Sequence, residues 1–437
     1  MRTRIPDALQ DDPDIAVMDD ILRKCVHCGF CLSACPTYQL SGDERASPRG
    51  RIYLIKSMIE GDADAAASIV PAIDSCLSCL ACASACPSGV DYQHFIDLAR
   101  PRIERVVERP RGDRFMRALL ARVLPYPKRF RAALALARLA RPIAPIVERL
   151  LGARFATVLR MAPARPRDGE MLEGPRTFPP SGRTTGRVAL LAGCAQQALR
   201  PSINAATVRL LNRMGVEVTV ADGVGCCGAL SHHMGREHEA RAFARAAVEG
   251  WRKLWASAPL DGVIVNAAGC GTHVKDYAFV LRGDALAEDA DTIAALADDI
   301  TEFVADRGLP PPITLHLPRV AYHDACSLLH GQRVTQQPRL LLRRAGFEVV
   351  EVPGQHFCCG SAGSYNLLQA ETADELNRRR IAQIEATGAE VIATGNIGCL
   401  EQLQRATRIP VIHTVELLDW ATGGPKPEAL AARQDEA

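Results

Sequence analysis

The sequence predicts a multidomain protein of mixed α/β and α+β class. An N-terminal α-helical domain that binds metal clusters is followed by a basic helical connector and two tandem cysteine-rich α/β modules. Two cysteine runs of identical spacing lie between residues 25 and 87, and a different set of cysteines occurs twice in the second half. Around that second set, short apolar runs alternate with helical patterns, which is typical of parallel α/β units.

The first two runs, Cys25–Pro36 and Cys76–Pro87, both read C-x2-C-x2-C-x3-C-P. This spacing is typical of two-cluster ferredoxins, in which three thiolates on a tight loop hold one cluster and the fourth ligates the other. We therefore expect two [4Fe–4S] clusters. Cluster one takes Cys25, Cys28, Cys31 and Cys86, and cluster two takes Cys76, Cys79, Cys82 and Cys35. The alternative is a pair of structural zinc sites, but these usually group their cysteines as two separated pairs.

Composition sets outer limits on the class of protein. The chain has 437 residues, which is enough for two or three domains, and its net charge of +2 provides no general attraction to nucleic acid. Its first 20 residues lack the apolar region of a signal peptide, and no apolar run is long enough to span a membrane. Sixteen cysteines without an export signal indicate a reducing compartment and metal ligation.

The predicted ferredoxin-type domain spans residues 1–99, of which 1–20 are interpreted as a short acidic lead-in. Between the cysteine runs, Ser47 followed by Pro48 predicts a helix start, with Ser47 as the N-cap. Apolar residues then recur at helical spacing at Ile52, Ile55 and Ile59, where they could cover a cluster.

Residues 100–161 are predicted to form a basic helical connector. Between residues 100 and 165 the chain has 17 basic residues and 4 acidic ones. Two uses fit: an amphipathic surface for anionic lipid, or a docking face for a partner subunit. The alternative is an ordinary solvated helical hairpin. No interleaved aromatic residues indicate base stacking, so nucleic acid is not expected as a partner. The Pro- and Gly-rich residues 162–187 are interpreted as a linker.

The second half contains an internal repeat, in which each copy includes a Cys-Cys-Gly sequence. We call the copies the first CCG module (188–310) and the second CCG module (311–420), and interpret residues 421–437 as a loose tail. Three cysteines shift by 132 residues (194 to 326, 226 to 358, 227 to 359) and the fourth by 129 (270 to 399). The first set is Cys194, Cys226, Cys227 and Cys270, and the second set is Cys326, Cys358, Cys359 and Cys399.

Each cysteine of these sets follows a predicted strand, such as Val216–Val220 or Val391–Ala393. Ligands of parallel α/β units collect beyond the carboxyl ends of strands, so all eight are candidate metal ligands. Adjacent cysteines cannot easily bind one small tetrahedral ion with good angles, but they can bridge neighbouring irons. The two sets could hold one centre each or share one. An iron–sulfur centre, a zinc site and a redox-active dithiol all stay open.

The whole pattern resembles the cysteine-rich iron–sulfur oxidoreductases, a group that includes heterodisulfide reductase and anaerobic glycerol-3-phosphate dehydrogenase subunits. Within that group it is most similar to the glycolate oxidase iron–sulfur subunits, over nearly the whole chain. The stretches that carry this resemblance are Leu22–Cys31, Pro36–Leu40, Pro48–Lys56, Gly193–Gln196, Cys358–Gly363 and Asn396–Cys399.

The resemblance implies the electron-transfer subunit of a glycolate dehydrogenase complex. Partner flavin subunits would oxidise glycolate to glyoxylate, and this chain would relay electrons through two [4Fe–4S] clusters toward a quinone-type acceptor. It would then lie in the cytoplasm, peripherally on the cytoplasmic face of the inner membrane. The alternatives are an iron–sulfur subunit of an anaerobic glycerol-3-phosphate or lactate dehydrogenase, or a heterodisulfide-reductase-like thiol/disulfide reductase. No catalytic residue is predicted in this chain.

The modules depart from the heterodisulfide pattern in one respect. Modules of that type often end in C-x-x-C, whereas here the first ends Cys270-Gly-Thr-His273 and the second Cys399-Leu-Glu-Gln402. His273 is therefore a candidate replacement ligand in the first module. His232, His233, His323 and His356 are interpreted as loop histidines, with tuning of a cluster potential by hydrogen bonding as the alternative.

Overall fold

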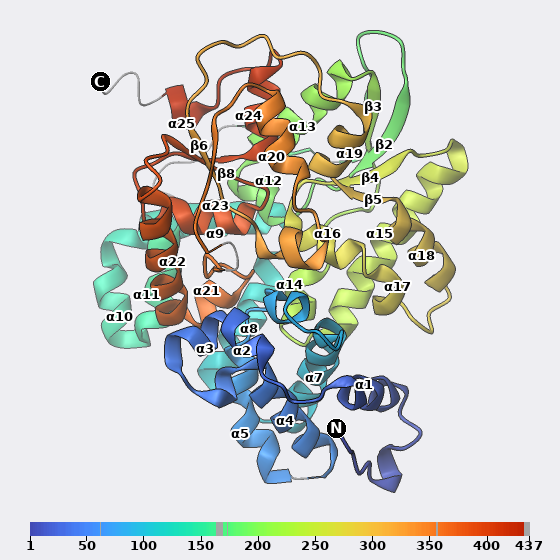
Figure 1. Ribbon diagram of the computed structural model, residues 1–437, viewed down its shortest axis with the longest axis vertical. Coiled ribbons are helices and arrows are strands. Elements are labelled where there is room, and N and C mark those ends of the chain that lie inside the picture. The colour runs from blue at the N-terminus through green and yellow to red at the C-terminus, as the bar shows by residue number, and fades with distance from the viewer. Residues whose placement is uncertain (62, 163–168, 173, 355–356, 432–437) are drawn as a thin grey trace.

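The computed structural model describes residues 1–61, 63–162, 169–172, 174–354 and 357–431. The helical N-terminal domain lies at the bottom of Figure 1 and the two β-sheets lie above it, with a group of helices from residues 111–161 at one side. The mixed α/β and α+β class predicted from the sequence is confirmed, with parallel strands in both sheets.

The N-terminal domain is a helical frame around the two cysteine loops. Its helices are η1 (Asp7–Leu9), α1 (Pro13–Lys24), α2 (Phe30–Ala34), α3 (Pro36–Ser41), η2 (Glu44–Ala46), α4 (Pro48–Ile59), α5 (Ala63–Asp74), α6 (Ala81–Ser84) and α7 (Tyr92–Val106). Helix α4 begins as predicted, because the Ser47 hydroxyl accepts a hydrogen bond from the Gly50 N–H and Pro48 takes the first helical position.

The prediction that residues 1–20 form a weakly patterned lead-in is wrong. Asp12 caps α1 by accepting hydrogen bonds from two backbone N–H groups, and Ile15, Met18 and Leu22 are buried in the same core as Ile52, Ile55 and Ile59 of α4. Acidic residues on the outer side of α1 hide this apolar stripe in a simple composition count.

The predicted boundary after residue 99 falls inside α7, whose Ile103 still belongs to the core of the N-terminal domain. Beyond it lie α8 (Arg111–Val123), α9 (Pro127–Ala140), η3 (Arg141–Ile143), α10 (Ala144–Leu151) and α11 (Ala153–Met161). Arg109 and Arg117 do not form a cationic surface, since both are buried and bind the Asp74 carboxylate at 2.6 and 3.0 Å. Part of the positive charge therefore serves to join the connector to α5.

The first CCG module contains a five-stranded sheet in the order β1-β3-β2-β4-β5. The strands are β1 (Arg176–Phe178), β2 (Gly186–Leu190), β3 (Val216–Val220), β4 (Gly262–Val265) and β5 (Ala297–Asp299). All neighbours are parallel except β1, which pairs antiparallel with β3. Because β1 lies within residues 162–187, that stretch is only partly a linker, and residues 163–168 and 173 of it lie outside the described chain. The helices of the first CCG module are α12 (Ala195–Leu199), α13 (Pro201–Arg213), α14 (Ala229–His233), α15 (Glu237–Ser257), α16 (Ala268–Val274), α17 (Tyr277–Val280), α18 (Ala287–Leu296) and α19 (Ile300–Arg307).

The second CCG module repeats this order with four parallel strands, β7-β6-β8-β9. They are β6 (Val320–Tyr322), β7 (Val349–Glu351), β8 (Val391–Thr394) and β9 (Val411–His413). Its helices are η4 (Ser327–Gly331, a short π-helical turn), α20 (Gln337–Arg344), α21 (Tyr365–Leu368), α22 (Ala370–Glu385), α23 (Ile397–Gln404), α24 (Thr414–Ala421) and α25 (Glu428–Ala431).

The two modules share one hydrophobic core, which runs from Val188 of β2 to Leu418 of α24. Polar contacts join them as well: Arg200 pairs with Glu401 at 2.7 Å, and the His413 Nε2–H donates to the Asn266 carbonyl at 2.8 Å. The predicted loose tail is partly wrong, because Leu430 of α25 packs against this core. The two modules therefore pack as one body, and this packing fixes the positions of their cysteine loops relative to each other.

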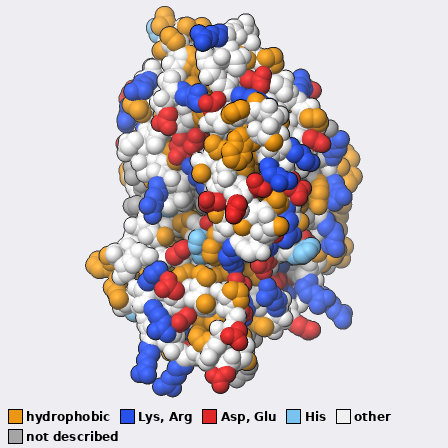
Figure 2. Space-filling view, turned by 90° about the vertical axis from the view of Figure 1, so that its right-hand side faces the viewer, with side chains coloured by type: hydrophobic (Ala, Val, Ile, Leu, Met, Phe, Trp, Pro, Cys, Tyr) orange, Lys and Arg blue, Asp and Glu red, His pale blue; other side chains and the backbone are white. Residues whose placement is uncertain are grey.

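Figure 2 shows one face of the molecule, on which Lys and Arg side chains are interspersed with Asp and Glu. That face offers no continuous field of one sign to a polyanion, in agreement with the small net charge. Among the described residues, no helix is both long and apolar enough to cross a bilayer.

Candidate metal centres

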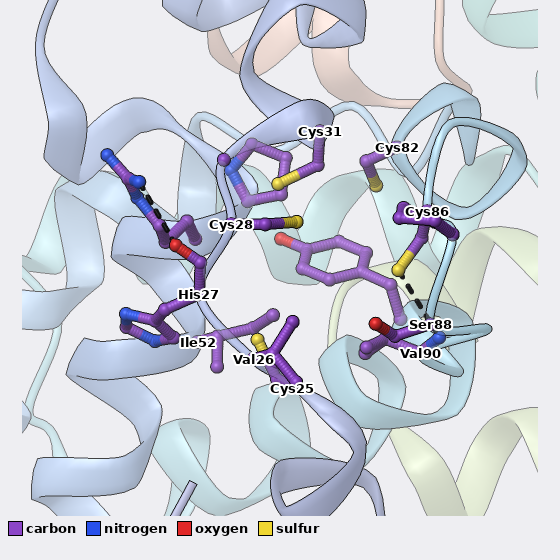
Figure 3. A pocket seen from close by; sticks show the side chains of 15 residues that line it. Cys25, Val26, His27, Cys28, Cys31, Ile52, Cys82, Cys86, Ser88 and Val90 are labelled. Atoms are coloured by element: carbon purple, nitrogen blue, oxygen red, sulfur yellow. Dashed lines mark hydrogen bonds between the residues drawn. The ribbon is translucent and has the colours of Figure 1, made fainter.

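Five cysteines from both runs of the ferredoxin-type repeat surround one cavity, which we call cavity one. Its walls contain Cys25, Cys28, Cys31, Cys82 and Cys86, and Figure 3 shows these side chains around one common space. The Val90 N–H donates to the Cys86 sulfur at 3.5 Å, and Arg49 donates to the His27 carbonyl at 3.2 Å. Burial raises the pKa of the Cys31 thiol to about 11, so an electrophilic metal is required to hold it as a thiolate.

The two cysteine loops have the same backbone conformation at equivalent positions. His27 and Gly29 have positive φ (57° and 87°), and so do Ser78 and Leu80 (49° and 61°) in the second loop. Residues other than glycine avoid this region, at a cost of about 1–2 kcal/mol each. In this shared conformation the first three cysteines of each loop line one cavity, Cys25, Cys28 and Cys31 in cavity one and Cys76, Cys79 and Cys82 in the second cavity described next.

Cavity two contains four cysteines of the repeat, Cys35, Cys76, Cys79 and Cys82. It is charged as well as apolar, because the buried guanidinium of Arg51 lies in its wall. Arg51 Nη1 lies 3.7 Å from the Cys35 sulfur, and its other N–H groups donate to the Ala72 carbonyl at 2.7 Å and to the Thr37 hydroxyl at 2.8 Å.

This cation changes the chemistry of the thiolates. Burial by itself would raise the pKa of Cys76, but the positive charges of Arg51 and then Arg100 hold that pKa below its usual value. Burial raises the pKa values of Cys79 and Cys82 well above the usual range. Four thiolates plus iron carry excess negative charge in a buried site, so Arg51 fits the role of a built-in counter-charge.

The two cavities are neighbours with a common wall. Pro48, Cys82 and Tyr92 line both of them. The Tyr92 hydroxyl lies 3.8 Å from the Cys76 sulfur. Each cavity thus has at least four cysteines in its walls, including one from the other run, Cys86 in cavity one and Cys35 in cavity two. Because Cys82 lines both cavities, the lining is compatible with the predicted assignment of ligands without deciding it.

The CCG cysteines lie at the carboxyl ends of the strands, as the sequence predicts. In the first module, Cys194 follows β2, the vicinal pair Cys226 and Cys227 follows β3, and Cys270 lies in α16 after β4. The thiols of this set perturb one another's pKa values in the order Cys194, Cys226, Cys227, Cys270, so they lie close together. The second set does the same in the order Cys326, Cys358, Cys359, Cys399.

The glycine after each vicinal pair is required by the geometry. Gly228 and Gly360 have φ of 96° and 84°, and each N–H donates to the first sulfur of its pair at 3.4 Å. A Cβ atom on Gly360 would lie 2.4 Å from the Ala373 carbonyl oxygen. The tight turn after each pair therefore favours glycine at this position.

The histidines differ between the two modules. His273 is buried, and burial lowers its pKa to about 3, so it is neutral. Its Nε2 has no hydrogen-bond partner in the described structure, yet His273 does not fall within a group of three close ligand atoms there. Such a group is found around His323, where a ring nitrogen and the sulfurs of Cys359 and Cys399 lie within 4.8 Å of one another.

The prediction of loop histidines is wrong for two of these residues, because His232 and His233 lie in helix α14, where His232 is buried and lies 3.2 Å from the Asp97 carboxylate of α7. His323 does lie in the loop after β6, but it is fully buried. His356 lies outside the described residues. Buried histidines near the cysteines can act on a metal centre, whereas solvated ones would have little effect.

Two functional cations were missed by the sequence reasoning. Arg51 lies at four-residue spacing from Ile55 and Ile59, and Arg380 lies midway between the buried Leu376 and Ile384 of α22. A charge on an apolar helical stripe is the signal that could have found them, since such a residue must meet a buried partner.

Comparison with known families agrees with this geometry. A 4Fe-4S dicluster domain matches residues 21–90, and a cysteine-rich domain of the CCG type matches residues 188–275 and again 320–404. The protein therefore carries two [4Fe–4S] clusters and two cysteine-rich modules, and the modules support a further centre. Each cluster, when bound, supplies one-electron chemistry.

Individual relatives cover the chain almost completely. The glycolate oxidase iron-sulfur subunit of Escherichia coli K12 is 37% identical, over 96% of this chain and 99% of that protein. A probable glycolate oxidase iron-sulfur subunit of Bacillus subtilis is 31% identical, over 92% and 94%. Lactate utilization protein A of Bacillus subtilis is 26% identical over only 53% of this chain, so the lactate-type alternative is related but not favoured. With its two cluster cavities and its paired CCG modules, this chain belongs to the family of glycolate oxidase iron–sulfur subunits.

Proposed function

We propose that this chain is the electron-transfer subunit of a complex that oxidises glycolate, and that it accepts electrons from flavin-binding partner subunits. The observation that carries this proposal is the pair of cysteine-lined cavities with a common wall, which together hold all eight cysteines of the two runs. Clusters bound side by side can pass single electrons, so the two-electron oxidation at a partner's flavin would leave in two steps. The relatives named for glycolate oxidase support the choice of substrate.

The ligand assignment is part of the proposal: Cys25, Cys28, Cys31 and Cys86 for cluster one, and Cys76, Cys79, Cys82 and Cys35 for cluster two. Iron and acid-labile sulfide analysis of anaerobically purified protein tests it. About eight irons per chain are expected from two clusters of four, and a larger value indicates an added CCG centre. A colourless, zinc-containing protein would contradict the proposal.

A substitution separates electron relay from substrate oxidation. In the assembled complex, Cys25→Ser removes or damages cluster one, so acceptor reduction should stop while glycolate still reduces the partner's flavin. Ser33→Ala is a suitable control, since Ser33 lies in the same cysteine run but is exposed and lines neither cavity. Normal steady-state turnover in the Cys25→Ser complex would refute the relay.

The surface around cavity one fits a docking face for the flavin subunit. Cys28 is exposed, and beside it Val26, Phe30 and Tyr53 are exposed by 69%, 65% and 57% although they are apolar or aromatic. A partner that covered these residues would bring its flavin close to cluster one. Phe30→Glu should weaken assembly of the complex and leave the iron content unchanged, as measured by size-exclusion chromatography.

The acceptor side is proposed to be a quinone at an anionic membrane surface. Helices α9 and α10 with η3 expose Leu136, Leu139, Ile143 and Ile146, and residues 127–150 contain six basic residues against one acidic residue, Glu148. Apolar side chains among cations suit the headgroup region of anionic lipid. Leu139→Glu should reduce co-sedimentation with phosphatidylglycerol vesicles, whereas unchanged binding would exclude this face.

Thiol/disulfide reduction by the CCG modules is the second candidate, favoured by the buried vicinal pairs of free thiols, Cys226 with Cys227 and Cys358 with Cys359. Turnover of a disulfide by the purified chain with an electron donor would support it.

A further inference from the structure

The two CCG modules meet the N-terminal domain in different ways. Cys326 and Cys358 of the second set pack in one apolar cluster with Leu77 and Cys79 of the second ferredoxin-type loop, and Tyr365 completes it. Cavity two thus adjoins the second set through sulfur and hydrocarbon.

A hydrogen bond reinforces this junction. His330 Nδ1 lies 2.9 Å from the Ser84 hydroxyl, and the two residues belong to short helices that carry or follow cluster cysteines. Ser84 lies in α6 with Cys82, while His330 lies in η4 directly after Cys326. The contact holds the second set in constant register with cavity two.

The first module meets helix α7 of the N-terminal domain mainly through polar residues. Asp97 and His232 lie 3.2 Å apart, His94 and Asp276 lie 2.8 Å apart, and Phe279 stacks on His94. Cys227 packs instead into its own module's core with Trp251 and Tyr277. Within the described chain, no apolar cluster joins a cysteine of the first set to a ferredoxin-type cysteine.

His323 distinguishes the second set further. Arg380 donates from Nε to His323 Nδ1 at 3.0 Å, and its Nη1 donates to the Pro353 and Gly354 carbonyls at 2.9 and 3.1 Å. Because a guanidinium can only donate, Nδ1 must be the acceptor nitrogen, and the neutral imidazole carries its proton on Nε2. That Nε2 is buried without a partner in the described structure, and a nitrogen of this ring lies within 4.8 Å of the Cys359 and Cys399 sulfurs.

Metal ligation by His323 would conflict with this arrangement. A ligand at Nε2 would need the proton on Nδ1, where it would oppose the Arg380 N–H, and a ligand at Nδ1 would displace Arg380 altogether. The matching position of the first module, 132 residues earlier, is Leu191, which has no nitrogen. The close group of His323, Cys359 and Cys399 therefore has the chemistry of a donor beside thiolates.

We propose that the second CCG module holds a redox centre that exchanges electrons directly with cluster two, and that the first cysteine set is not part of this path. We propose further that His323 donates an N–H hydrogen bond to a sulfur of this centre. The inference extends the proposed relay and rests on it. In this electron transfer, cluster two, bound by Cys35, Cys76, Cys79 and Cys82, would lose one electron. The centre bound by Cys326, Cys358, Cys359 and Cys399 would gain it. No bond is made or broken.

Spin–spin interaction between reduced centres, measured in the full-length holoprotein, tests whether the second-module centre lies next to cluster two. The reduced cluster-two signal in electron paramagnetic resonance should be broadened by the second-module centre. Cys358→Ser should remove this broadening, and the matched variant Cys226→Ser should retain it. Absence of broadening in the unsubstituted protein, its persistence in Cys358→Ser, or its loss in Cys226→Ser would each overturn the proposal.

The role of His323 is tested by His323→Leu, which introduces the residue found at the matching position of the first module. Iron and sulfide should stay at the level of the unsubstituted protein. The reduction equilibrium of the second-module centre should become about tenfold less favourable, a shift of about 59 mV for one electron. His323→Gln, which restores an N–H donor, should recover part of that shift. Loss of iron in His323→Leu that is restored in His323→Cys would show a ligand instead, and an unchanged potential would also refute the donor.

These readouts are separable from the proposed function. If the relay itself is wrong, clusters one and two will fail to accept electrons from the flavin subunits in every variant. If only this inference is wrong, those clusters will still be reduced by glycolate through the complex, and the broadening or the potential will not change as stated.

Discussion

Replacing Arg51 should lower the reduction potential of cluster two and leave cluster one almost unchanged. Arg51 is buried against cavity two, with Nη1 at 3.7 Å from the Cys35 sulfur and donor contacts to Thr37 and Ala72. Reduction adds one negative charge to the cluster, and this fixed cation favours that charge. Arg51→Gln keeps a polar side chain and removes the cation, so the oxidised state gains relative stability.

The size of the shift follows from Coulomb's law. Two unit charges at 3.7 Å would interact by about 4.5 kcal/mol at an effective dielectric constant of about 20. Because the added electron is spread over the cluster, a mean separation of roughly 8 Å is more suitable, which corresponds to about 2 kcal/mol. At 59 mV per tenfold change for one electron, the potential should fall by about 90 mV.

A redox titration followed by electron paramagnetic resonance measures both clusters in the same sample. Arg51→Lys retains the charge and should stay near the unsubstituted protein, which separates charge from packing. Arg49→Gln is the matched control on the same helix, since Arg49 is partly exposed beside cavity one and should affect cluster one only slightly. With the full iron content present, equal shifts in Arg51→Gln and Arg51→Lys would refute the electrostatic reasoning.

Three further predictions concern stability. Gly360→Ala should lower the melting temperature more than Gly308→Ala does, although both glycines have left-handed φ. A Cβ on residue 360 would lie 2.4 Å from a carbonyl oxygen, whereas a Cβ on residue 308 faces open space and should cost only about 1–2 kcal/mol. Similar losses of melting temperature in the two variants would contradict this. Burial opposes the charged form of His94, but two neighbouring carboxylates outweigh it and raise the pKa of His94 to about 10. Its contribution to the free energy of unfolding is therefore complete below about pH 6.5 and is lost as the pH rises toward 10. In urea titrations His94→Gln should flatten this decline, and an unchanged pH profile would exclude His94 as its cause. Asp74→Asn removes the carboxylate shared by two buried arginines and should cost about 3 kcal/mol in urea unfolding, with the exposed Asp20→Asn as the control that should cost little.

Local signals in the sequence accounted for much of the architecture. Strands β3 and β6 have the bounds of the predicted apolar runs, and the start of α4 was predicted from Ser47 and Pro48. The apolar stripe of α1 was missed, although Asp12 and Pro13 carry the usual signals of a helix start. The acidic composition of residues 1–20 conceals the helical spacing of Ile15, Met18 and Leu22.

By itself the sequence determined the two cysteine runs, the repeat of the CCG modules and the position of each cysteine after a strand, because spacing and periodicity are properties of neighbouring residues. Only the tertiary structure decided that Cys79 meets Cys358, that Arg51 is buried beside Cys35, and that Arg380 sets the proton of His323. These contacts join segments remote in sequence or depend on the direction of one buried hydrogen bond. No local pattern specifies them, because they arise when the domains pack and buried charges must find partners.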